Sequence, residues 1–153
     1  MERVVLDTNL FINLMIETEL TEKAKFLLKK VVTNYKPIIL SNIFEETIFI
    51  LIREELKVRG NISRFHEVID YIEKRDYKDM KLYKEFINLL NDLNIEFLTN
   101  RFDVSDFKDI LEGYRLLPND ALIAATCRFY GIRRIATFDD DFKRVKFLKV
   151  VEV

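Results

Sequence analysis

The sequence predicts an α/β fold: a three-layer α/β/α sandwich with a central parallel sheet of about five strands. Short, apolar, β-rich runs alternate along the chain with longer segments of helical periodicity. The runs are mostly apolar rather than alternating, which is typical of strands that helices cover on both faces. The chain has 153 residues, three glycines, two prolines and no linker-like stretch, so we expect one domain spanning residues 1–153.

Five runs fit buried strands, because each is short, rich in β-branched or other large apolar residues, and bounded by polar residues. They are Val4–Leu6, Ile38–Leu40, Ile95–Leu98, Arg134–Thr137 and Phe147–Val151. The connections between them are long enough for helical crossovers. We therefore expect parallel strands with right-handed crossovers, which place helices on both faces of the sheet.

Helices are expected at Leu20–Val32, Ile43–Leu56, Ile62–Ile72, Met80–Leu93, Asp103–Leu116 and Asn119–Tyr130. The first carries a stripe of apolar residues at helical spacing, and the second is so apolar that it should be buried. Gly131 is typical of a helix C-cap and should end the last helix. No strand separates the third helix from the fourth, so residues 60–94 are expected to form a helical hairpin inserted in the domain and projecting from its core.

Composition excludes several classes of protein. The longest apolar run, Ile48–Ile52, is far too short to cross a bilayer. The N-terminal residues lack the order of charge and apolarity found in signal peptides. The single cysteine, Cys127, cannot form an internal disulfide, and no Cys/His cluster suits zinc. We expect a cytoplasmic protein that makes no membrane contact.

Charge is nearly balanced but unevenly distributed. A net charge of −1 gives the molecule no strong field to attract nucleic acid. Basic residues nevertheless crowd the last quarter of the chain: Arg128, Arg133, Arg134, Lys143, Arg144, Lys146 and Lys149. They are either the solvated, ion-paired exterior that such residues usually form, or a basic surface around acids whose charge bound cations offset.

Acids from four separate segments are expected at one edge of the sheet. Asp7 directly follows the first predicted strand, and Asp139 lies just beyond the end of the fourth. Asp120 is in the first turn of the helix that leads into the fourth strand. Glu45 and Glu46 begin the helix after the second strand. Ligands of open parallel sheets bind beyond the carboxyl ends of the strands, where these acids should meet.

Each acid alone has a simpler explanation as a helix cap or as a charge at the positive end of a helix dipole. Together they are harder to explain structurally, because clustered carboxylates repel one another and raise one another's pKa unless a cation neutralises them. Oxygen ligands without Cys or His suit Mg²⁺ or Mn²⁺. Such ions can activate water and stabilise both the attacking and the leaving oxygen at a phosphodiester, so the acids indicate a metal-dependent enzyme that hydrolyses phosphodiester bonds.

Four motifs in series resemble the PIN domain family. They are VVLDTN at residues 4–9, Glu46 at the start of an apolar helix, NDALIAA at residues 119–125, and TFDDDF at residues 137–142. Their order and spacing match the family over nearly the whole chain. The last two motifs are weak alone, but they are specific in series with an N-terminal aspartate after a short strand.

The resemblance implies a Mg²⁺- or Mn²⁺-dependent nuclease acting mainly on RNA. For many members it also implies a VapBC-type toxin that a small antitoxin neutralises and that assembles as a homodimer. The implied catalytic acids are Asp7, Glu46, Asp120 and Asp139, with the metal held by Asp7, Asp120 and Asp139.

The auxiliary residues that the resemblance implies are Asn9 and Thr137, which would orient carboxylates by hydrogen bonding, and Asp141, an additional acid. Of the two adjacent glutamates, Glu46 fits the family pattern better than Glu45. Because neighbouring helical residues point about 100° apart, only one of the two can face the cluster.

Other functions stay open. One is an RNA-processing PIN nuclease without an antitoxin, and another is a non-catalytic interaction module that keeps the fold and docks partners on its long apolar helices. A phosphoacceptor domain of the response-regulator type normally needs paired acids after its first strand, where Asp7 stands alone. Ser41 has no histidine or lysine placed to activate it, which disfavours a nucleophilic hydrolase.

His66, Cys127 and the phenylalanines are further candidates for a functional role. His66, the only histidine, and Cys127 fit surface and core positions respectively. Most phenylalanines recur at core spacing, but Phe102 and Phe142 lie near loops at the active edge and are candidates for stacking on bases.

Overall fold

The computed structural model describes residues 1–153 and contains a five-stranded sheet in the order β3-β2-β1-β4-β5. The strands are β1 (Arg3–Leu6), β2 (Lys36–Leu40), β3 (Glu96–Leu98), β4 (Arg134–Ala136) and β5 (Lys149–Val150). Every pairing is parallel, so the predicted parallel sheet is confirmed. The chain builds β2 and β3 on one side of β1 and places β4 and β5 on the other, so the strand order reverses at β1.

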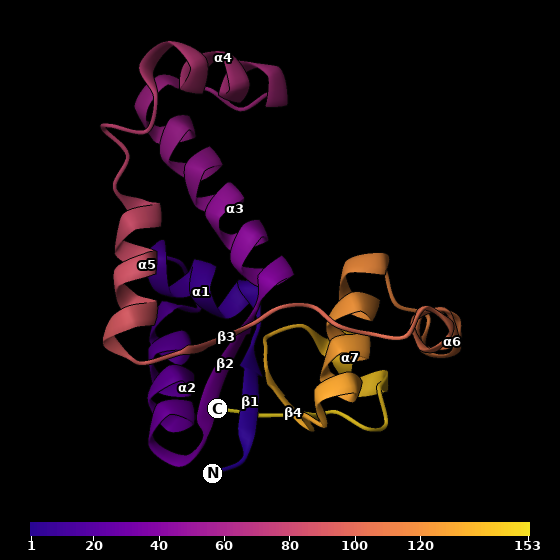
Figure 1. The fold of residues 1–153 in the computed structure, drawn as a ribbon. Coiled ribbons are helices and arrows are strands. Elements are labelled where there is room, and N and C mark those ends of the chain that lie inside the picture. Colours follow the sequence, from indigo (N-terminus) through magenta and orange to yellow (C-terminus); the bar gives the residue numbers. More distant parts are fainter.

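Helices cover both faces of this sheet (Figure 1). They are α1 (Thr8–Met15), α2 (Thr21–Asn34), α3 (Ser41–Gly60), α4 (Phe65–Arg75), α5 (Leu82–Asp92), α6 (Val104–Tyr114) and α7 (Pro118–Tyr130), with a 3-10 turn η1 (Asp140–Arg144). Helices α1, α2 and α5 lie on one side and α7 on the other, with α6 beyond α7. No helix combines the length and apolar character needed to cross a membrane.

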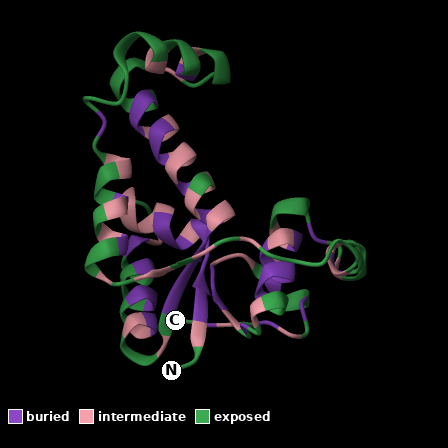
Figure 2. Cartoon of the chain, in the orientation of Figure 1, coloured by how far each residue is buried: buried purple, intermediate pink, exposed green.

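The central strands are apolar because both of their faces are covered. Val4, Val5 and Leu6 of β1 are fully buried, and Figure 2 shows these strands in the middle of the molecule. On α7 the small residues Ala121 and Ala124 are also fully buried, because small side chains let that helix lie close to the sheet. The uninterrupted apolar pattern of the sequence is therefore explained by the two covering layers.

The two helices of residues 60–94 lie differently from each other. Phe86 of α5 packs in the main core against Phe11, with ring centroids 5.1 Å apart. Helix α4 lies at the far end of α3, away from the sheet (Figure 1). There a small separate cluster joins α3, α4 and the segment before α5: Ile52, Leu56, Val68 and Met80. Thus α5 belongs to the core layer, and α4 is the part that projects.

A buried carboxylate fixes the start of α5. Glu55 of α3 accepts hydrogen bonds from the backbone N–H groups of Lys81 and Leu82, at 2.9 and 2.8 Å. Arg59 of the next turn of α3 pairs with the same carboxylate at 3.1 Å. Because the first N–H groups of a helix have no partner within the helix, Glu55 caps α5 and anchors it to α3.

Candidate active site

Two aspartates lie side by side because they follow neighbouring strands. Asp7 follows β1 and Asp139 lies just beyond β4, and these strands are paired. Asp7 is buried and N-caps α1, with Oδ1 accepting from the Thr8 N–H at 2.8 Å. Asp139 N-caps η1 and accepts from the Asp141 N–H at 2.8 Å. Both acids are therefore helix caps, as their sequence contexts allowed, and the caps hold their carboxylates at the carboxyl edge of the sheet.

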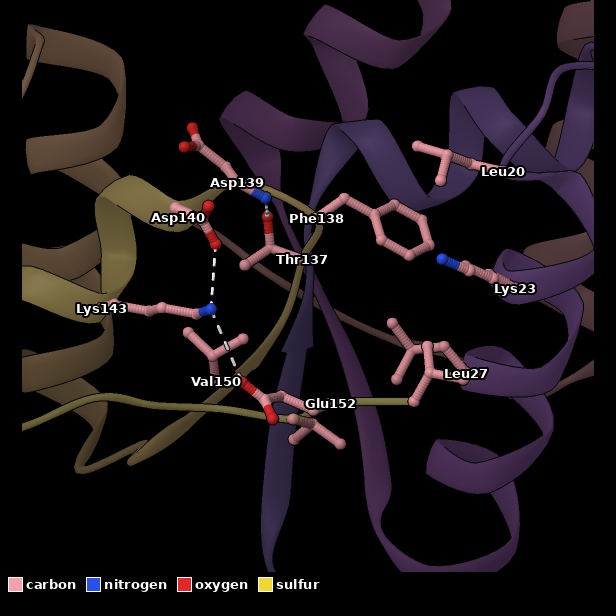
Figure 3. Close-up of a pocket in the computed structure, with 12 residues that line it drawn as sticks. Leu20, Lys23, Leu27, Thr137, Phe138, Asp139, Asp140, Lys143, Val150 and Glu152 are labelled. Atoms are coloured by element: carbon pink, nitrogen blue, oxygen red, sulfur yellow. Dashed lines mark hydrogen bonds and ion pairs between the residues drawn. The ribbon is translucent and has the colours of Figure 1, made fainter.

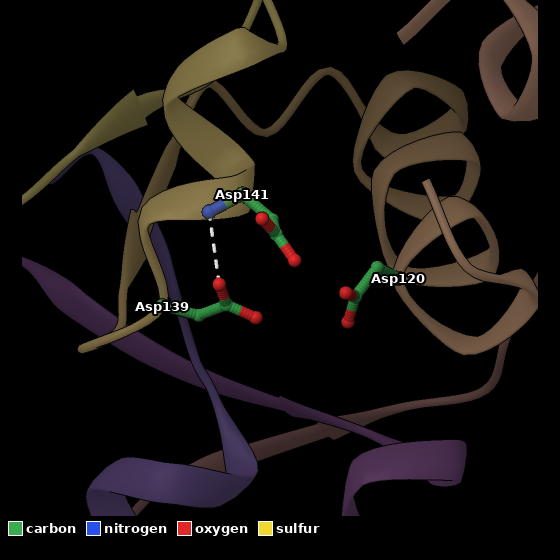
Figure 4. Close-up of side chains that lie close together, drawn as sticks. All are labelled: Asp120, Asp139 and Asp141. Atoms are coloured by element: carbon green, nitrogen blue, oxygen red, sulfur yellow. Dashed lines mark hydrogen bonds between the residues drawn. The ribbon is translucent and has the colours of Figure 1, made fainter. Parts of the chain in front are cut away.

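Asp120 and Asp141 complete a group of facing carboxylates (Figure 4). Asp120 projects from the first turn of α7, which Pro118 opens, and Asp141 projects from η1. Oxygen atoms of Asp120, Asp139 and Asp141 lie within 4.8 Å of one another. A cation between them would therefore meet three carboxylates from two different elements.

Glu46 is the glutamate that α3 turns toward this group. Its Oε2 accepts hydrogen bonds from the Thr8 hydroxyl at 2.8 Å and from the Asn119 amide at 3.2 Å. Its Oε1 has no hydrogen-bond partner in the protein. Glu45 is exposed and makes no side-chain hydrogen bond or ion pair. The structure thus distinguishes the two adjacent glutamates, which sequence position alone did not.

One open cavity of about 330 Å³ joins the four acids that the sequence placed at this edge. Asp7, Glu46, Asp120 and Asp139 all line it, although they come from segments far apart in the chain. Uncharged polar side chains such as Asn13 complete much of the wall, and no lysine, arginine or histidine contributes. The cavity is thus strongly acidic.

Thr137 and Asn9 connect the acids by hydrogen bonds. The Thr137 hydroxyl donates to Asp7 Oδ2 at 2.7 Å and accepts from the Asp139 N–H at 3.0 Å. The Asn9 amide in turn donates to the Thr137 hydroxyl at 3.0 Å, and its carbonyl oxygen accepts from the Phe138 N–H. These bonds lock the chain after β4 against the chain after β1.

The proximity of the acids perturbs their titration. Burial raises the pKa of Asp7 from 3.8 to about 6, against the lowering effect of its hydrogen bonds to Thr137 and Thr8. Partial burial and then the negative charges of Asp7, Asp139, Asp141 and Glu46 raise the pKa of Asp120 to about 6 as well. The ionised forms of these two carboxylates are thus unfavourable in the folded protein, and binding of a proton or a divalent cation would remove much of this penalty. An all-oxygen donor set of this kind fits Mg²⁺ or Mn²⁺.

Sequence reasoning did not assign roles to several polar residues of the site. Asn119 donates to Glu46, Asn42 donates to Asn119 at 3.0 Å, and Asn100 donates to Asn42 at 2.9 Å. This chain of amides joins the end of β3 to the acid cavity. Thr8 was overlooked in the same way. The available signal was position, since Thr8 and Asn119 directly neighbour Asp7 and Asp120.

The other candidates fall outside the cavity. Cys127 is fully buried, as predicted. Phe142 is also fully buried, so the expectation that it could stack on bases is wrong: the short η1 turn folds its ring into the core. Phe102 is 38% exposed and packs beside Phe107. His66 is exposed on α4, remote from the sheet.

Comparison with known proteins agrees with this architecture. The family model for the PIN domain matches residues 4–148. Among curated relatives, ribonuclease VapC6 of Methanocaldococcus jannaschii is 30% identical over 97% of this chain and 96% of its own length. Ribonuclease VapC2 of the same organism is 46% identical, but the match covers 52% of this chain and 58% of the relative.

Solved structures share the fold. The Mycobacterium tuberculosis VapC20 toxin, described as cleaving the sarcin-ricin loop, superposes with a TM-score of 0.57 at 15% identity, covering 98% of this chain and 99% of its own. Rickettsia felis VapBC2, bound to a DNA fragment from its promoter, superposes with a TM-score of 0.61 at 15% identity, covering 97% of both chains. At such identities these likenesses concern the fold alone.

Proposed function

The chain belongs to the PIN domain family, and we propose that it is a metal-dependent endoribonuclease that hydrolyses RNA phosphodiester bonds. The observation that carries the proposal is the convergence of four acids, Asp7, Glu46, Asp120 and Asp139, on one cavity at the carboxyl edge of the sheet. The two curated relatives, both named ribonucleases, support RNA as the substrate.

Asp120, Asp139 and Asp141 would hold a divalent cation, and Asp7 would contribute from the buried side of the cavity. When bound, Mg²⁺ or Mn²⁺ supplies neutralising charge at the phosphodiester and makes a water molecule more acidic. The raised pKa values of Asp7 and Asp120 support this assignment, because burial and, after it, neighbouring negative charges disfavour the ionised carboxylates, and a bound cation would offset both effects.

Glu46 would accept the proton of the attacking water. Thr8 and Asn119 both donate to its Oε2, which fixes the carboxylate and leaves Oε1 free. In the reaction, the water oxygen bonds to phosphorus, the bond from phosphorus to one ribose oxygen breaks, and that oxygen leaves with a proton from solvent. Glu46 takes the proton of the water and returns it to solvent after product release.

The adjacent glutamates give a matched test. Purified protein should cleave single-stranded RNA with Mg²⁺ or Mn²⁺ and not with EDTA. Glu46→Gln should reduce the cleavage rate by about 10²–10⁴-fold, the usual range for loss of a general base. Glu45→Gln makes the same chemical change one residue away on the exposed face, and should cleave at the wild-type rate. Equal activity of the two variants would overturn the role of Glu46, and wild-type protein without metal-dependent cleavage would overturn the function.

We further propose that the enzyme is the cytoplasmic toxin of a VapBC-type pair, with a small antitoxin as partner, and that it forms a homodimer. The relatives' VapC names support the toxin assignment. Expression in bacteria should slow growth, and Asp120→Asn should abolish the effect. Growth at the normal rate despite active enzyme would favour an RNA-processing nuclease that has no antitoxin. Light scattering on the purified protein would test the dimer.

A further inference from the structure

The acid cavity offers no cationic side chain to the phosphates that flank the scissile bond. Its carboxylates repel the neighbouring phosphates. Affinity for nucleic acid comes mostly from contacts between Lys or Arg and phosphate groups. A nuclease with this cavity therefore needs a cationic surface beside it.

One groove of about 600 Å³ provides such a surface, where the end of α6, the last turn of α7 and the end of η1 with the chain after it meet. Four cationic side chains line it, Arg115, Arg128, Arg144 and Lys146, against the single acid Asp109. We call it the basic groove. Its excess of positive charge differs sharply from the net charge of −1 of the whole chain.

Most of these cations have no strong partner in the protein. Arg115 and Lys146 are exposed and form no ion pair or side-chain hydrogen bond. Arg128 lies over the ring of Phe147 at 5.2 Å, and its one ion pair, with Asp106, is long at 3.9 Å. Their positive charge is therefore available to a ligand, unlike that of a typical ion-paired exterior.

Arg144 joins the basic groove to the group of facing carboxylates. Its Nη1 donates to Asp141 at 2.9 Å, and its Nε and Nη2 donate to the backbone carbonyls of Tyr114 and Arg115, both at 2.9 Å. Asp141 is one of the three facing carboxylates. The Arg144 guanidinium therefore lies between the basic groove and the group of facing carboxylates, and it also fixes the backbone that carries Arg115.

Arg115 occupies a backbone conformation that arginine rarely adopts. It is the C-cap of α6, in the left-handed region with φ 55° and ψ 48°. The other non-glycine residues with positive φ are two asparagines and an aspartate, Asn61, Asn94 and Asp76, types that tolerate it better. Because Gly or Asn would be favoured here, an unpaired arginine at the mouth of a basic groove indicates a functional position.

The cavity of Figure 3, which shares Asp139 with the acid cavity, does not fit an anionic strand. In the cavity of Figure 3, Lys143 pairs with Asp140 at 3.0 Å and with Glu152 at 3.6 Å, so its charge is already compensated. Three acids, Asp139, Asp140 and Glu152, face two lysines there. The lysines of this cavity thus face an excess of acids, whereas the cations of the basic groove outnumber its single acid.

We propose that the basic groove binds phosphate groups of the RNA strand on one side of the scissile bond, with Arg115 and Lys146 as its main contacts. This inference rests on the proposed ribonuclease function. Arg128 contributes from α7, and Arg144 acts mainly as a positioning residue because its guanidinium is already hydrogen-bonded.

The test measures RNA binding as a function of salt. Anisotropy of a fluorescein-labelled single-stranded RNA would be recorded with Mg²⁺ in the Asp120→Asn background, which prevents cleavage. The variant combines Arg115→Asn, which keeps a residue suited to the left-handed conformation, with Lys146→Gln. The control combines Lys29→Gln on α2 with Arg133→Gln before β4. These residues are exposed and unpaired like the pair in the groove, and lie away from the acid cavity.

Loss of two phosphate contacts should lower the slope of log affinity against log salt by about 1.4, from 0.7 per contact on a single strand. Between 50 and 200 mM salt the protein with an intact groove should therefore lose about 7-fold more affinity than the groove variant. The control should keep the original slope. An unchanged slope in the groove variant would overturn the inference, and would leave an acidic protein as the ligand to test. Wild-type cleavage of RNA tests the ribonuclease function separately, so the two failures can be distinguished.

Discussion

Asp120→Asn should stabilise the metal-free protein at neutral and alkaline pH. Asp120 makes no hydrogen bond or ion pair in the structure, and its pKa is raised to about 6 by burial and by four neighbouring acids. The substitution therefore removes a repelled charge without breaking a favourable contact. Most substitutions in an active site that remove a charge partner destabilise, so the direction expected here is diagnostic.

The magnitude follows from linkage between proton binding and folding. The difference between a pKa of about 6 in the folded state and 3.8 in the unfolded state corresponds to about 3 kcal/mol. Because Asp120 is only half-buried, solvent screening reduces this to about 1.5 kcal/mol. For an acid whose folded pKa is raised, the penalty is absent below the unfolded pKa of 3.8 and complete above about 6. In a domain of this size it corresponds to a melting temperature higher by about 3–6 °C in the variant.

Thermal unfolding in EDTA, followed by circular dichroism at about pH 8 and about pH 4, measures this difference at both ends of the titration. The variant should melt higher at the alkaline pH and together with the wild type at the acidic one. Asp70→Asn, an exposed aspartate of α4 without a partner, should change neither value. Mn²⁺ at a hundred times its dissociation constant should raise the free energy of unfolding of the wild type by about 3 kcal/mol. It should raise that of the variant by much less. If the variant melts lower than the wild type in EDTA at alkaline pH, the electrostatic reasoning fails; equal stabilisation of both by Mn²⁺ would refute a cation site at Asp120.

Three further predictions test other parts of the structure. Cys127 is fully buried, and burial raises its pKa to about 12. The native protein should therefore resist a thiol reagent that labels the unfolded protein at once. Rapid labelling of the native protein would mean that α7 does not pack as described. Glu55→Gln weakens the cap of α5 and should lower the free energy of unfolding by about 2 kcal/mol, or the melting temperature by about 4–8 °C. Glu54→Gln on the same helix should change the melting temperature little. Similar losses in both variants would refute the cap. Asn42→Ala breaks the row of amide hydrogen bonds that supports Asn119, and it should lower the cleavage rate by more than the loss of folded protein explains. A rate that falls only in proportion to the folded fraction would mean that these amides serve stability alone.

The fold was largely predictable because its elements depend on local patterns. The apolar runs become parallel strands, and Gly131 ends α7 in the left-handed conformation expected of a C-cap glycine. The division of residues 60–94 was not predictable. Whether α5 packs on α1 or projects with α4 depends on tertiary contacts such as that of Phe86 with Phe11. The pattern of α5 itself is that of any amphipathic helix.

The acids of the site were predictable from the sequence, but the polar residues that support them were not. Strand order brings Asp7 beside Asp139, because the chain after β3 passes β2 and β1 through α6 and α7 and then pairs β4 with β1. Which of Glu45 and Glu46 faces the cavity depends on the rotation of α3 about its axis, which Thr8 and Asn119 help to fix. A polar side chain in a loop looks the same in sequence whether it binds water or a catalytic carboxylate, so Asn42 and Asn100 gave no signal.

The capping and catalytic interpretations of the acids are compatible, and this affects how the site should be probed. Asp7 and Asp139 accept backbone hydrogen bonds as N-caps while their charge faces the cavity. Asn caps a helix about as well as Asp, whereas Ala costs about 1 kcal/mol. Asp7→Asn and Asp139→Asn therefore remove charge and keep the local fold, so loss of metal binding in these variants would report the missing carboxylate. Asp7→Ala would remove the cap and the charge together, and the difference in melting temperature between the two Asp7 variants measures how much of the site's architecture the cap itself maintains.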